Sequence, residues 1–188
     1  MPFYSSGPGY SGMLKVMVFV DGGYLERNMQ GILGKSYLDY SAFANRLTSH
    51  LPGSSAAYYL IRIYYYDAIY ADKLPEEQRI KHQQIHNTDR FELRLGRLKN
   101  DGEGKPKQKG VDALIAIDMV SMAYENHYDI AVLLAGDDDF LDVVKAVKNA
   151  GKMVVGFFFE QHISVDLKNI LDTRVPIDST FATQLKPQ

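Results

Sequence analysis

The 188-residue sequence predicts one α/β domain whose central sheet is mostly parallel and covered by helices on both faces. Three observations lead to this prediction. Short apolar runs of strand length alternate along the chain with segments of helical character. Several of these runs are apolar at every position, as in strands buried on both sides. No linker or internal repeat divides the chain, and its length suits one ordinary domain.

The first half of the chain contains five predicted elements. An apolar run that ends at the turn-like Asp21-Gly22-Gly23 predicts a strand at Leu14–Val20, and apolar residues at helical spacing predict a helix at Ser41–Leu51. A composition dense in Tyr and Ile predicts a strand at Ala56–Tyr66. A proline suited to a first helical turn predicts a helix at Pro75–Thr88, and strict apolar–polar alternation predicts a strand at Phe91–Leu95.

The second half continues the alternation after a Gly- and Lys-rich stretch at 100–110, which we predict to be a loop. One helix of this half is apolar on nearly every side, and we therefore expect it to be buried all round. Gly151 is placed to end a helix, and Ser164 to cap one. The elements are a helix at Val111–Tyr124, a strand at Ile130–Ala135, a helix through Phe140–Val147, a strand at Met153–Phe159 and a helix at Ser164–Leu171.

The composition excludes several classes of protein. The chain has no cysteine, which rules out a disulfide scaffold, a zinc finger, an iron–sulfur cluster and thiol catalysis. Its apolar runs are far shorter than a membrane helix needs, and its start does not resemble an export signal, so we expect a cytoplasmic protein without a membrane partner. The formal net charge of −2 indicates no global attraction to nucleic acid.

We expect a flexible segment at 1–13, one domain at 14–180 and a tail at 181–188.

Three separate parts of the chain are expected to deliver carboxylates to one edge of the sheet. Asp21 ends the first strand, Asp112 opens the helix at 111–124, and Asp137-Asp138-Asp139 follows the strand at 130–135. Ligands of parallel sheets bind beyond the carboxyl ends of the strands, near the point where the strand order reverses. Carboxylates brought together there repel one another unless a cation neutralises them, and oxygen ligands suit Mg²⁺ or Mn²⁺. Such an ion activates water and polarises phosphoryl oxygens, which favours a phosphodiester substrate. Taken singly, each aspartate could also be a turn residue or a helix cap.

These residues carry a resemblance to a known family. The blocks Val18-Phe19-Val20-Asp21-Gly22-Gly23-Tyr24-Leu25, Lys109-Gly110-Val111-Asp112 with Asp118, and Gly136-Asp137-Asp138-Asp139-Phe140 resemble, in the right order, the signatures of NYN domains. More narrowly, they resemble the LabA/DUF88 branch of the PIN-like nuclease superfamily. The resemblance runs from about Lys15 to about Asp178. It implies a three-layer, Rossmann-like α/β/α sandwich and a ribonuclease site that uses Mg²⁺ or Mn²⁺.

By this resemblance, the catalytic and metal-binding residues are Asp21, Asp112, Asp137 and Asp139. Asp118 matches a further family aspartate and is expected to support them. At this mid-helix position its carboxylate must be paired, metal-bound or protonated. The chain departs from the family where Ala135 replaces a usual serine and where Asp138 replaces a small residue, which adds charge beside the site. We count Asp138 as supporting too.

Positive residues near the aspartates are candidates for binding the substrate. Lys105, Lys107 and Lys109 precede Asp112 in the Gly-rich stretch and could contact a phosphate backbone, although a solvated loop explains them equally well. Arg62 is a further candidate phosphate contact.

The expected function is metal-dependent endoribonuclease activity on single-stranded or structured RNA. The sequence leaves two alternatives open: a Mg²⁺-dependent nucleotide phosphohydrolase, and a non-catalytic RNA-binding or regulatory module that retains the fold. It also leaves a homodimer open.

Overall fold

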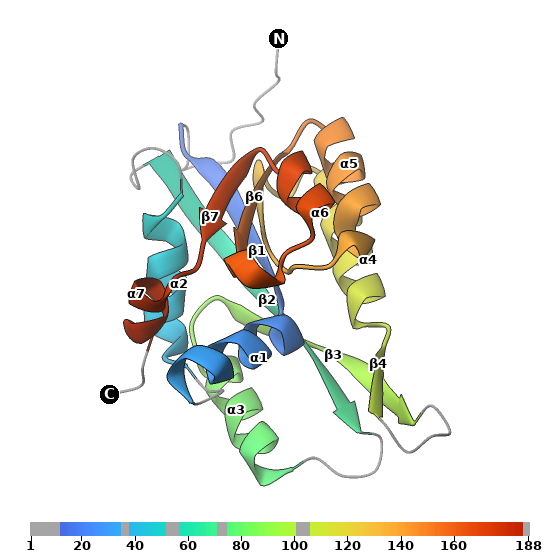
Figure 1. Ribbon diagram of the computed structural model, residues 1–188. Coiled ribbons are helices and arrows are strands. Elements are labelled where there is room, and N and C mark those ends of the chain that lie inside the picture. Colours follow the sequence, from blue (N-terminus) through green and yellow to red (C-terminus); the bar gives the residue numbers. More distant parts are fainter. Residues whose placement is uncertain (1–11, 35–37, 52–56, 71–74, 101–105, 186–188) are drawn as a thin grey trace.

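The structure is a computed structural model that describes residues 12–34, 38–51, 57–70, 75–100 and 106–185. The strands within this part of the chain form one seven-stranded sheet, in the order β4-β3-β2-β1-β5-β6-β7. All neighbouring strands are parallel except β3 and β4, which are antiparallel. The mostly parallel sheet predicted from the sequence is confirmed (Figure 1).

The bounds of the elements agree with most of the predicted ones. The strands are β1 (Leu14–Asp21), β2 (Tyr58–Tyr70), β3 (Phe91–Asn100), β4 (Pro106–Lys109), β5 (Ile130–Leu134), β6 (Met153–Phe158) and β7 (Thr173–Pro176). The helices are α1 (Gly22–Leu33), α2 (Tyr40–Ser49), α3 (Glu76–His86), α4 (Val111–Tyr124), α5 (Leu141–Asn149), α6 (Val165–Ile170) and α7 (Ser179–Thr183), with short 3-10 helices η2 (Asp138–Phe140) and η3 (Glu160–His162).

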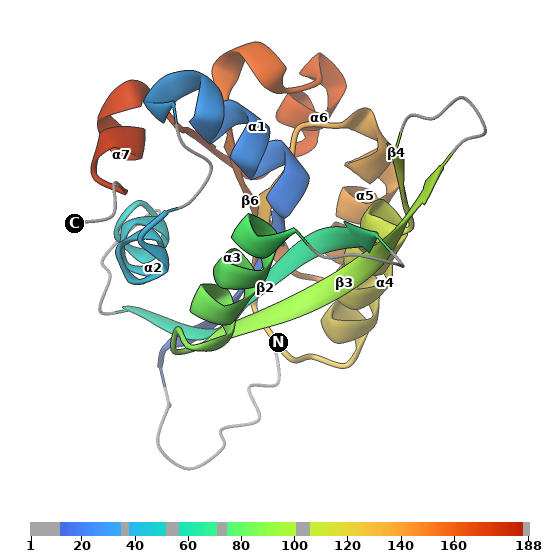
Figure 2. The same cartoon turned by 90° about the horizontal axis from the view of Figure 1, so that it is seen from below.

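Helices cover both faces of the sheet and give the protein three layers (Figure 2). Helices α1, α2, α3 and α7 contribute to the hydrophobic core on one face, and α4, α5 and α6 to the core on the other. Strand β1 serves both cores, because Val18 and Val20 face the first and Met17 and Phe19 face the second. Burial on both faces explains why this strand is apolar at successive positions.

The strand order reverses between β1 and β5. Strand β1 pairs with β2 on one side and with β5 on the other. The first part of the chain therefore builds the sheet in one direction, and β5, β6 and β7 extend it in the opposite direction. This is the switch point at which open α/β sheets bind their ligands, beyond the carboxyl ends of the strands.

Helix α1 replaces the turn predicted after the first strand. It begins at Gly22, directly after β1, with Asp21 as its N-cap. A Cβ atom on Gly22 would lie 2.5 Å from Cε1 of Tyr65 and 2.6 Å from the carbonyl oxygen of Tyr66. The start of α1 thus packs so closely on β2 that only glycine fits, and the same glycine makes the sequence look like a turn.

The stretch predicted as a loop at 100–110 is partly strand. Strand β3 continues to Asn100, and Pro106–Lys109 pairs with it antiparallel as β4, while residues 101–105 lie outside the described part of the chain. Lysine and proline are poor strand formers, so pairing with β3, rather than local propensity, decides this structure.

Helix α4 is not buried all round, contrary to the prediction. Only Val111, Ile115, Met119 and Ala123 are fully buried, whereas the Ile117 side chain is 62% exposed. As a helix of an outer layer, α4 buries one stripe against the sheet and leaves its opposite face in solvent.

The C-terminal segment is packed further than predicted. Strand β7 and helix α7 were not predicted, and Phe181, Ala182 and Leu185 are buried in the core. The tail predicted at 181–188 therefore begins too early, because elements of four or five residues carry too little periodicity to be recognised. Residues 1–11 of the predicted flexible segment lie outside the described residues. Among the helices that the structure describes, none has the length and apolar character required to span a bilayer.

Candidate active site

A pocket of about 700 Å³ lies at the carboxyl ends of β1 and β5, at the switch point of the sheet. Three separate parts of the chain deliver aspartates to it: the end of β1, the first turn of α4 and the segment after β5. We call it the acidic pocket. Its lining residues are Asp21, Tyr24, Arg27, Asn28, Asp112, Gly136, Asp137, Asp138, His162 and Ser164.

Asp21 is the most deeply buried carboxylate of the acidic pocket, with 9% of the residue exposed. Its Oδ1 atom accepts a hydrogen bond from the backbone N–H of Tyr24, 3.0 Å away, which fixes the side chain as the cap of α1. Burial raises the pKa of Asp21 to about 6, and the charge of Asp112 adds to this effect, while the Tyr24 hydrogen bond and Arg27 oppose it. An anion at this position is therefore costly without a cation.

Asp112 lies in the first turn of α4 and faces the other aspartates. Burial raises the pKa of this carboxyl, and the charges of Asp137 and Asp139 raise it further, while Arg27 lowers it. The charge of Asp112 in turn raises the pKa of Asp21, so the carboxylates from α4, β1 and the segment after β5 repel one another.

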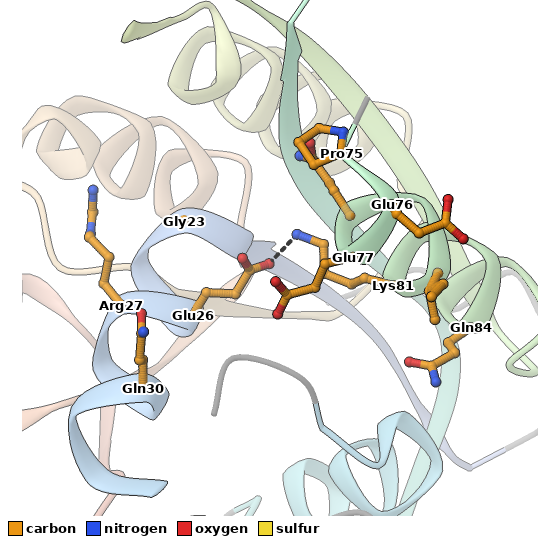
Figure 3. Close-up of a pocket in the computed structure, with 11 residues that line it drawn as sticks. Gly23, Glu26, Arg27, Gln30, Pro75, Glu76, Glu77, Lys81 and Gln84 are labelled. Atoms are coloured by element: carbon orange, nitrogen blue, oxygen red, sulfur yellow. Dashed lines mark hydrogen bonds and ion pairs between the residues drawn. The ribbon is translucent and has the colours of Figure 1, made fainter. Parts of the chain in front are cut away.

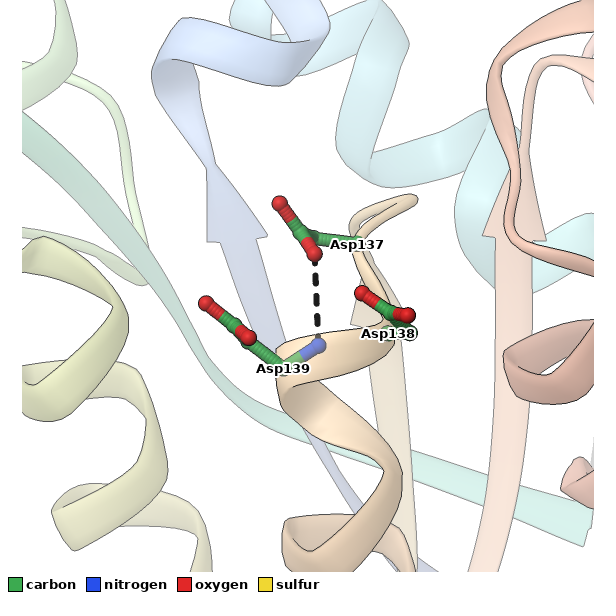
Figure 4. Close-up of side chains that lie close together, drawn as sticks. All are labelled: Asp137, Asp138 and Asp139. Carbon is green, nitrogen blue, oxygen red and sulfur yellow. Dashed lines mark hydrogen bonds between the residues drawn. The ribbon is translucent and has the colours of Figure 1, made fainter.

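The three consecutive aspartates form a cluster in which one carboxylate oxygen from each lies within 4.8 Å of the other two (Figure 4). Asp137 caps η2, and its Oδ1 atom accepts a hydrogen bond of 3.2 Å from the backbone N–H of Asp139. A hydrogen bond shared with Asp137 raises the pKa of Asp138. All three side chains are exposed, so each carboxylate is open to a ligand from solvent.

The structure thus brings together Asp21, Asp112 and Asp137 of the predicted catalytic set. Asp139 does not line the acidic pocket, but its carboxylate lies beside Asp137 and acts on Asp112. Asp138, expected only to support the site, is itself a lining residue.

Asp118 lies outside the acidic pocket. Its Oδ2 atom accepts a hydrogen bond of 2.8 Å from the hydroxyl of Tyr66 and lies 3.7 Å from Nε of Arg94. Of the three states open to this mid-helix carboxylate, the structure shows the paired one.

Of the predicted phosphate-binding cations, Arg62 has a described side chain, and it does not line the acidic pocket. Arg62 lies in β2, four residues before the end of the β1–β2 pairing, and its guanidinium forms an ion pair with Glu92. Lys107 and Lys109 lie in β4, which leads directly into α4, and Lys105 falls outside the described residues.

The residues that α1 contributes to the acidic pocket were not predicted from the sequence, because helix α1 itself was not. Arg27 and Asn28 follow Tyr24 at i+3 and i+4, which is the spacing of one helical face, and recognition of α1 would have revealed them. Asn28 donates a hydrogen bond of 2.8 Å to the carbonyl oxygen of Tyr24, and its Oδ1 atom contacts Nδ1 of His162. These contacts tie α1 to η3 across the acidic pocket.

Gly136 permits this close approach. A Cβ atom on Gly136 would lie 2.1 Å from the carbonyl oxygen of His162 and 2.4 Å from Cε2 of Tyr24. Its carbonyl oxygen also accepts a hydrogen bond of 2.8 Å from the backbone N–H of Ser164. Glycine at this position therefore lets the segment after β5 lie directly against η3.

The donor atoms of the acidic pocket fit a divalent cation. Its charge comes from carboxylates, whose oxygens are the ligands that Mg²⁺ and Mn²⁺ prefer. The raised pKa values of Asp21 and Asp112 show that burial and mutual repulsion disfavour their ionised forms, a cost that a bound cation would offset. Asp21, Asp112 and Asp137 line the pocket, and within the described residues the carboxylate oxygens that lie within 4.8 Å of one another are those of Asp137, Asp138 and Asp139.

The fold and the acidic pocket together define an α/β protein with an aspartate-lined pocket at the switch point of its sheet. The chain belongs to the NYN domain family, whose sequence model matches residues 15–178. The members of this family are generally nucleases. The family assigned by resemblance in the sequence is confirmed, and the narrower LabA/DUF88 branch stays a prediction.

Two further proteins are similar to this chain. One is a protein of unknown function, VPA0982, from Vibrio parahaemolyticus, whose crystal structure matches 89% of this chain and 95% of its own with a TM-score of 0.69 and 21% identity. At this identity, the likeness supports the fold alone. The other, the uncharacterized protein y4oD of Sinorhizobium fredii, is 37% identical over 70 residues, which are 37% of this chain and 31% of that protein.

Proposed function

We propose that this chain is a ribonuclease that hydrolyses RNA phosphodiester bonds with Mg²⁺ or Mn²⁺ held in the acidic pocket. The observation that carries the proposal is the convergence of Asp21, Asp112 and Asp137 from three parts of the chain, in a pocket where burial and repulsion raise the pKa of the first two. Membership in a family of nucleases supports the reaction class.

Four aspartates and Arg27 have separate parts in this proposal. A bound divalent ion would activate water and polarise a phosphoryl oxygen. Asp21 is held by the N–H of Tyr24 and would supply a fixed ligand, and Asp112 and Asp137, which line the same pocket, would complete the set. Asp139, whose carboxylate lies beside that of Asp137, would orient the attacking water. Arg27 lines the pocket, and its guanidinium would contact the substrate phosphate.

Positive residues of β4 support RNA as the substrate. Lys107 and Lys109 lie on a strand that ends one residue before α4, so the chain itself holds them close to Asp112. Contacts from ammonium groups to phosphates raise affinity without reading the sequence. The RNA target, a homodimer and the cytoplasmic location expected from the sequence stay predictions.

The test is the cleavage of end-labelled RNA by the full chain with Mg²⁺, with Mn²⁺ and with EDTA. We expect cleavage only with metal, and products with 3′-hydroxyl and 5′-phosphate ends, because water rather than the ribose 2′-hydroxyl attacks. Asp112→Asn should abolish cleavage while leaving the circular dichroism spectrum unchanged. Asp142→Asn is the matched control, because Asp142 is an exposed aspartate of α5 that is paired with Lys145 and lies outside the acidic pocket.

The same preparations separate the alternatives. Release of phosphate from a panel of nucleotides, with RNA left intact, would favour the nucleotide phosphohydrolase. Metal-independent binding of RNA without any hydrolysis would favour the non-catalytic module. Equal cleavage by the parent and by Asp112→Asn would refute the proposed site and would indicate a contaminating nuclease.

A further inference from the structure

A second cavity, of about 950 Å³, lies between α1 and α3 (Figure 3). We call it the α1/α3 cleft. Its walls include Glu26, Arg27 and Gln30 from α1 and Ile80, Lys81 and Gln84 from α3. A volume of this size is within the range of sites that hold a small organic ligand. Neither the fold nor the proposed hydrolysis accounts for it.

The cleft adjoins the acidic pocket through α1. Arg27 lines both cavities, and the adjacent residues Gly23 and Tyr24 line the cleft and the acidic pocket respectively. Arg27, Asp21 and Asp112 line the same acidic pocket, and the charge of Arg27 lowers the pKa of both carboxyl groups. A phosphate bound at Arg27 would therefore lie between the two cavities.

A network of buried charges holds the inner part of the cleft in one arrangement. The ammonium group of Lys81, whose side chain is only 8% exposed, lies 2.5 Å from Oε1 of Glu26 and 2.7 Å from Oδ2 of Asp67. The hydroxyl of Tyr65 donates to the same Oε1 atom at 2.6 Å, and Nε2 of His82 lies 2.6 Å from Oδ2 of Asp67. Buried ion pairs are poor sources of net stability but can fix geometry.

This network leaves one fixed acceptor for a ligand. Both bonds to Glu26 are made at Oε1, and within the described residues no donor contacts Oε2. The Glu26 side chain is 23% exposed and lines the cleft. Two donors therefore hold this carboxylate in place, and its second oxygen can accept a hydrogen bond from a bound molecule.

The other walls of the cleft offer contacts of the kinds that a nucleoside uses. The amide groups of Gln30 and Gln84 can donate and accept hydrogen bonds, and both residues are exposed. Ile80, which is 45% exposed, offers an apolar surface. Single-stranded RNA is recognised by contacts to the faces of splayed bases and by hydrogen bonds to their edges and to the ribose hydroxyls.

We propose that the α1/α3 cleft binds the nucleoside next to the scissile phosphate, with Glu26 accepting a hydrogen bond from it and Arg27 holding the phosphate between the two cavities. This inference rests on the proposed ribonuclease function. It also sets the direction in which the RNA strand lies, because the nucleoside on one side of the scissile bond would extend from the acidic pocket along α1 towards α3.

The test fills the cleft with a large side chain. Gln84→Trp places an indole in the cleft, and Gln83→Trp is the matched control, because Gln83 is the neighbouring exposed glutamine of α3 and does not line the cleft. The probes are a fluorescein-labelled decaribonucleotide, followed by anisotropy in EDTA and by cleavage in Mn²⁺, and bis(4-nitrophenyl) phosphate, a diester small enough to need the acidic pocket alone.

We expect Gln84→Trp to weaken binding of the decaribonucleotide and to raise its KM by about fivefold or more, the effect of losing a single base contact. Hydrolysis of the small diester should stay unchanged, and Gln83→Trp should match the parent in every assay. Equal binding and equal KM for the two tryptophan variants would overturn the inference. Absence of hydrolysis of both substrates by the parent would refute the proposed function instead, and anisotropy would then still decide whether the cleft binds RNA.

Discussion

Substitution of Asp21 by asparagine should stabilise the metal-free protein at neutral pH. The introduced amide side chain would keep the cap of α1, because asparagine caps helices about as well as aspartate. The substitution would remove a negative charge that burial and the charge of Asp112 make costly. The expected gain comes from relieving this cost, which the parent chain bears only in the absence of a cation.

The size and the pH dependence of the gain follow from the raised pKa. In the folded chain the pKa of Asp21 rises from its ordinary value of 3.8 to about 6. The folded state therefore binds this proton more tightly than the unfolded state, and the contribution to stability is complete below about pH 4 and lost as the pH rises through 6. Each pKa unit corresponds to about 1.4 kcal/mol, so the loss is about 3 kcal/mol at pH 7.

The assay is urea unfolding in EDTA between pH 4 and pH 7. The difference in the free energy of unfolding between Asp21→Asn and the parent should be about 3 kcal/mol at pH 7 and should shrink towards pH 4. Asp39→Asn is the control, because Asp39 caps α2 in the same way but lies outside the acidic pocket, and it should change stability little. A pH-independent difference, or a less stable Asp21→Asn chain at pH 7, would refute the electrostatic account of the pocket.

Three other predictions concern the metal, the packing and the buried network. Mn²⁺ should raise the unfolding temperature of the parent by mass action, and Asp137→Asn should lose most of this response in a thermal shift titration; a response equal to that of the parent would contradict the ligand assignment. Gly136→Ala should cost about 1–3 kcal/mol in urea unfolding, because its Cβ atom would overlap the carbonyl oxygen of His162, and unchanged stability would argue against this close approach. Although burial opposes it, hydrogen bonding from His82 and the charge of Lys81 hold the pKa of Asp67 below its usual range, so Asp67→Asn should cost about 3–5 kcal/mol in urea unfolding at pH 7. The difference between the parent and Asp67→Asn should shrink as the pH falls below about 4, and an equal difference at pH 3 and pH 7 would count against the network.

Most of the fold could be predicted because its strands are buried on both faces. Such strands need apolar residues at every position, so β1, β5 and β6 are evident from composition alone. Helix α4 has the predicted bounds, but its apolar composition does not show which side faces the sheet: Ile117 and Tyr124 are exposed, and Ile115 and Met119 are buried. Elements that depend on tertiary pairing, such as β4, have no local signal of their own.

The candidate site could be predicted where its residues follow strands directly or open a predicted helix, as Asp112 does. Asp21 and Asp137 come at or just after the carboxyl ends of β1 and β5, so the expected parallel sheet was enough to place them side by side. Arg27 and Asn28 lie on α1, and this helix could not be predicted because Gly22 makes its start look like a turn. Arg62 stays a predicted phosphate contact, and sequence alone does not reveal that it forms an ion pair with Glu92.

The two outermost strands bear on how this protein associates with itself. Strands β4 and β7 form the edges of the sheet, and each has only four residues. Each contains a proline, Pro106 or Pro176, which cannot donate a backbone hydrogen bond, and each contains cationic residues, Lys107 and Lys109 in β4 and Arg174 in β7. Short edges with prolines and positive charges offer a poor template for adding a strand from another molecule. We therefore expect the sheet to resist edge-to-edge aggregation, and any homodimer to form through its helices.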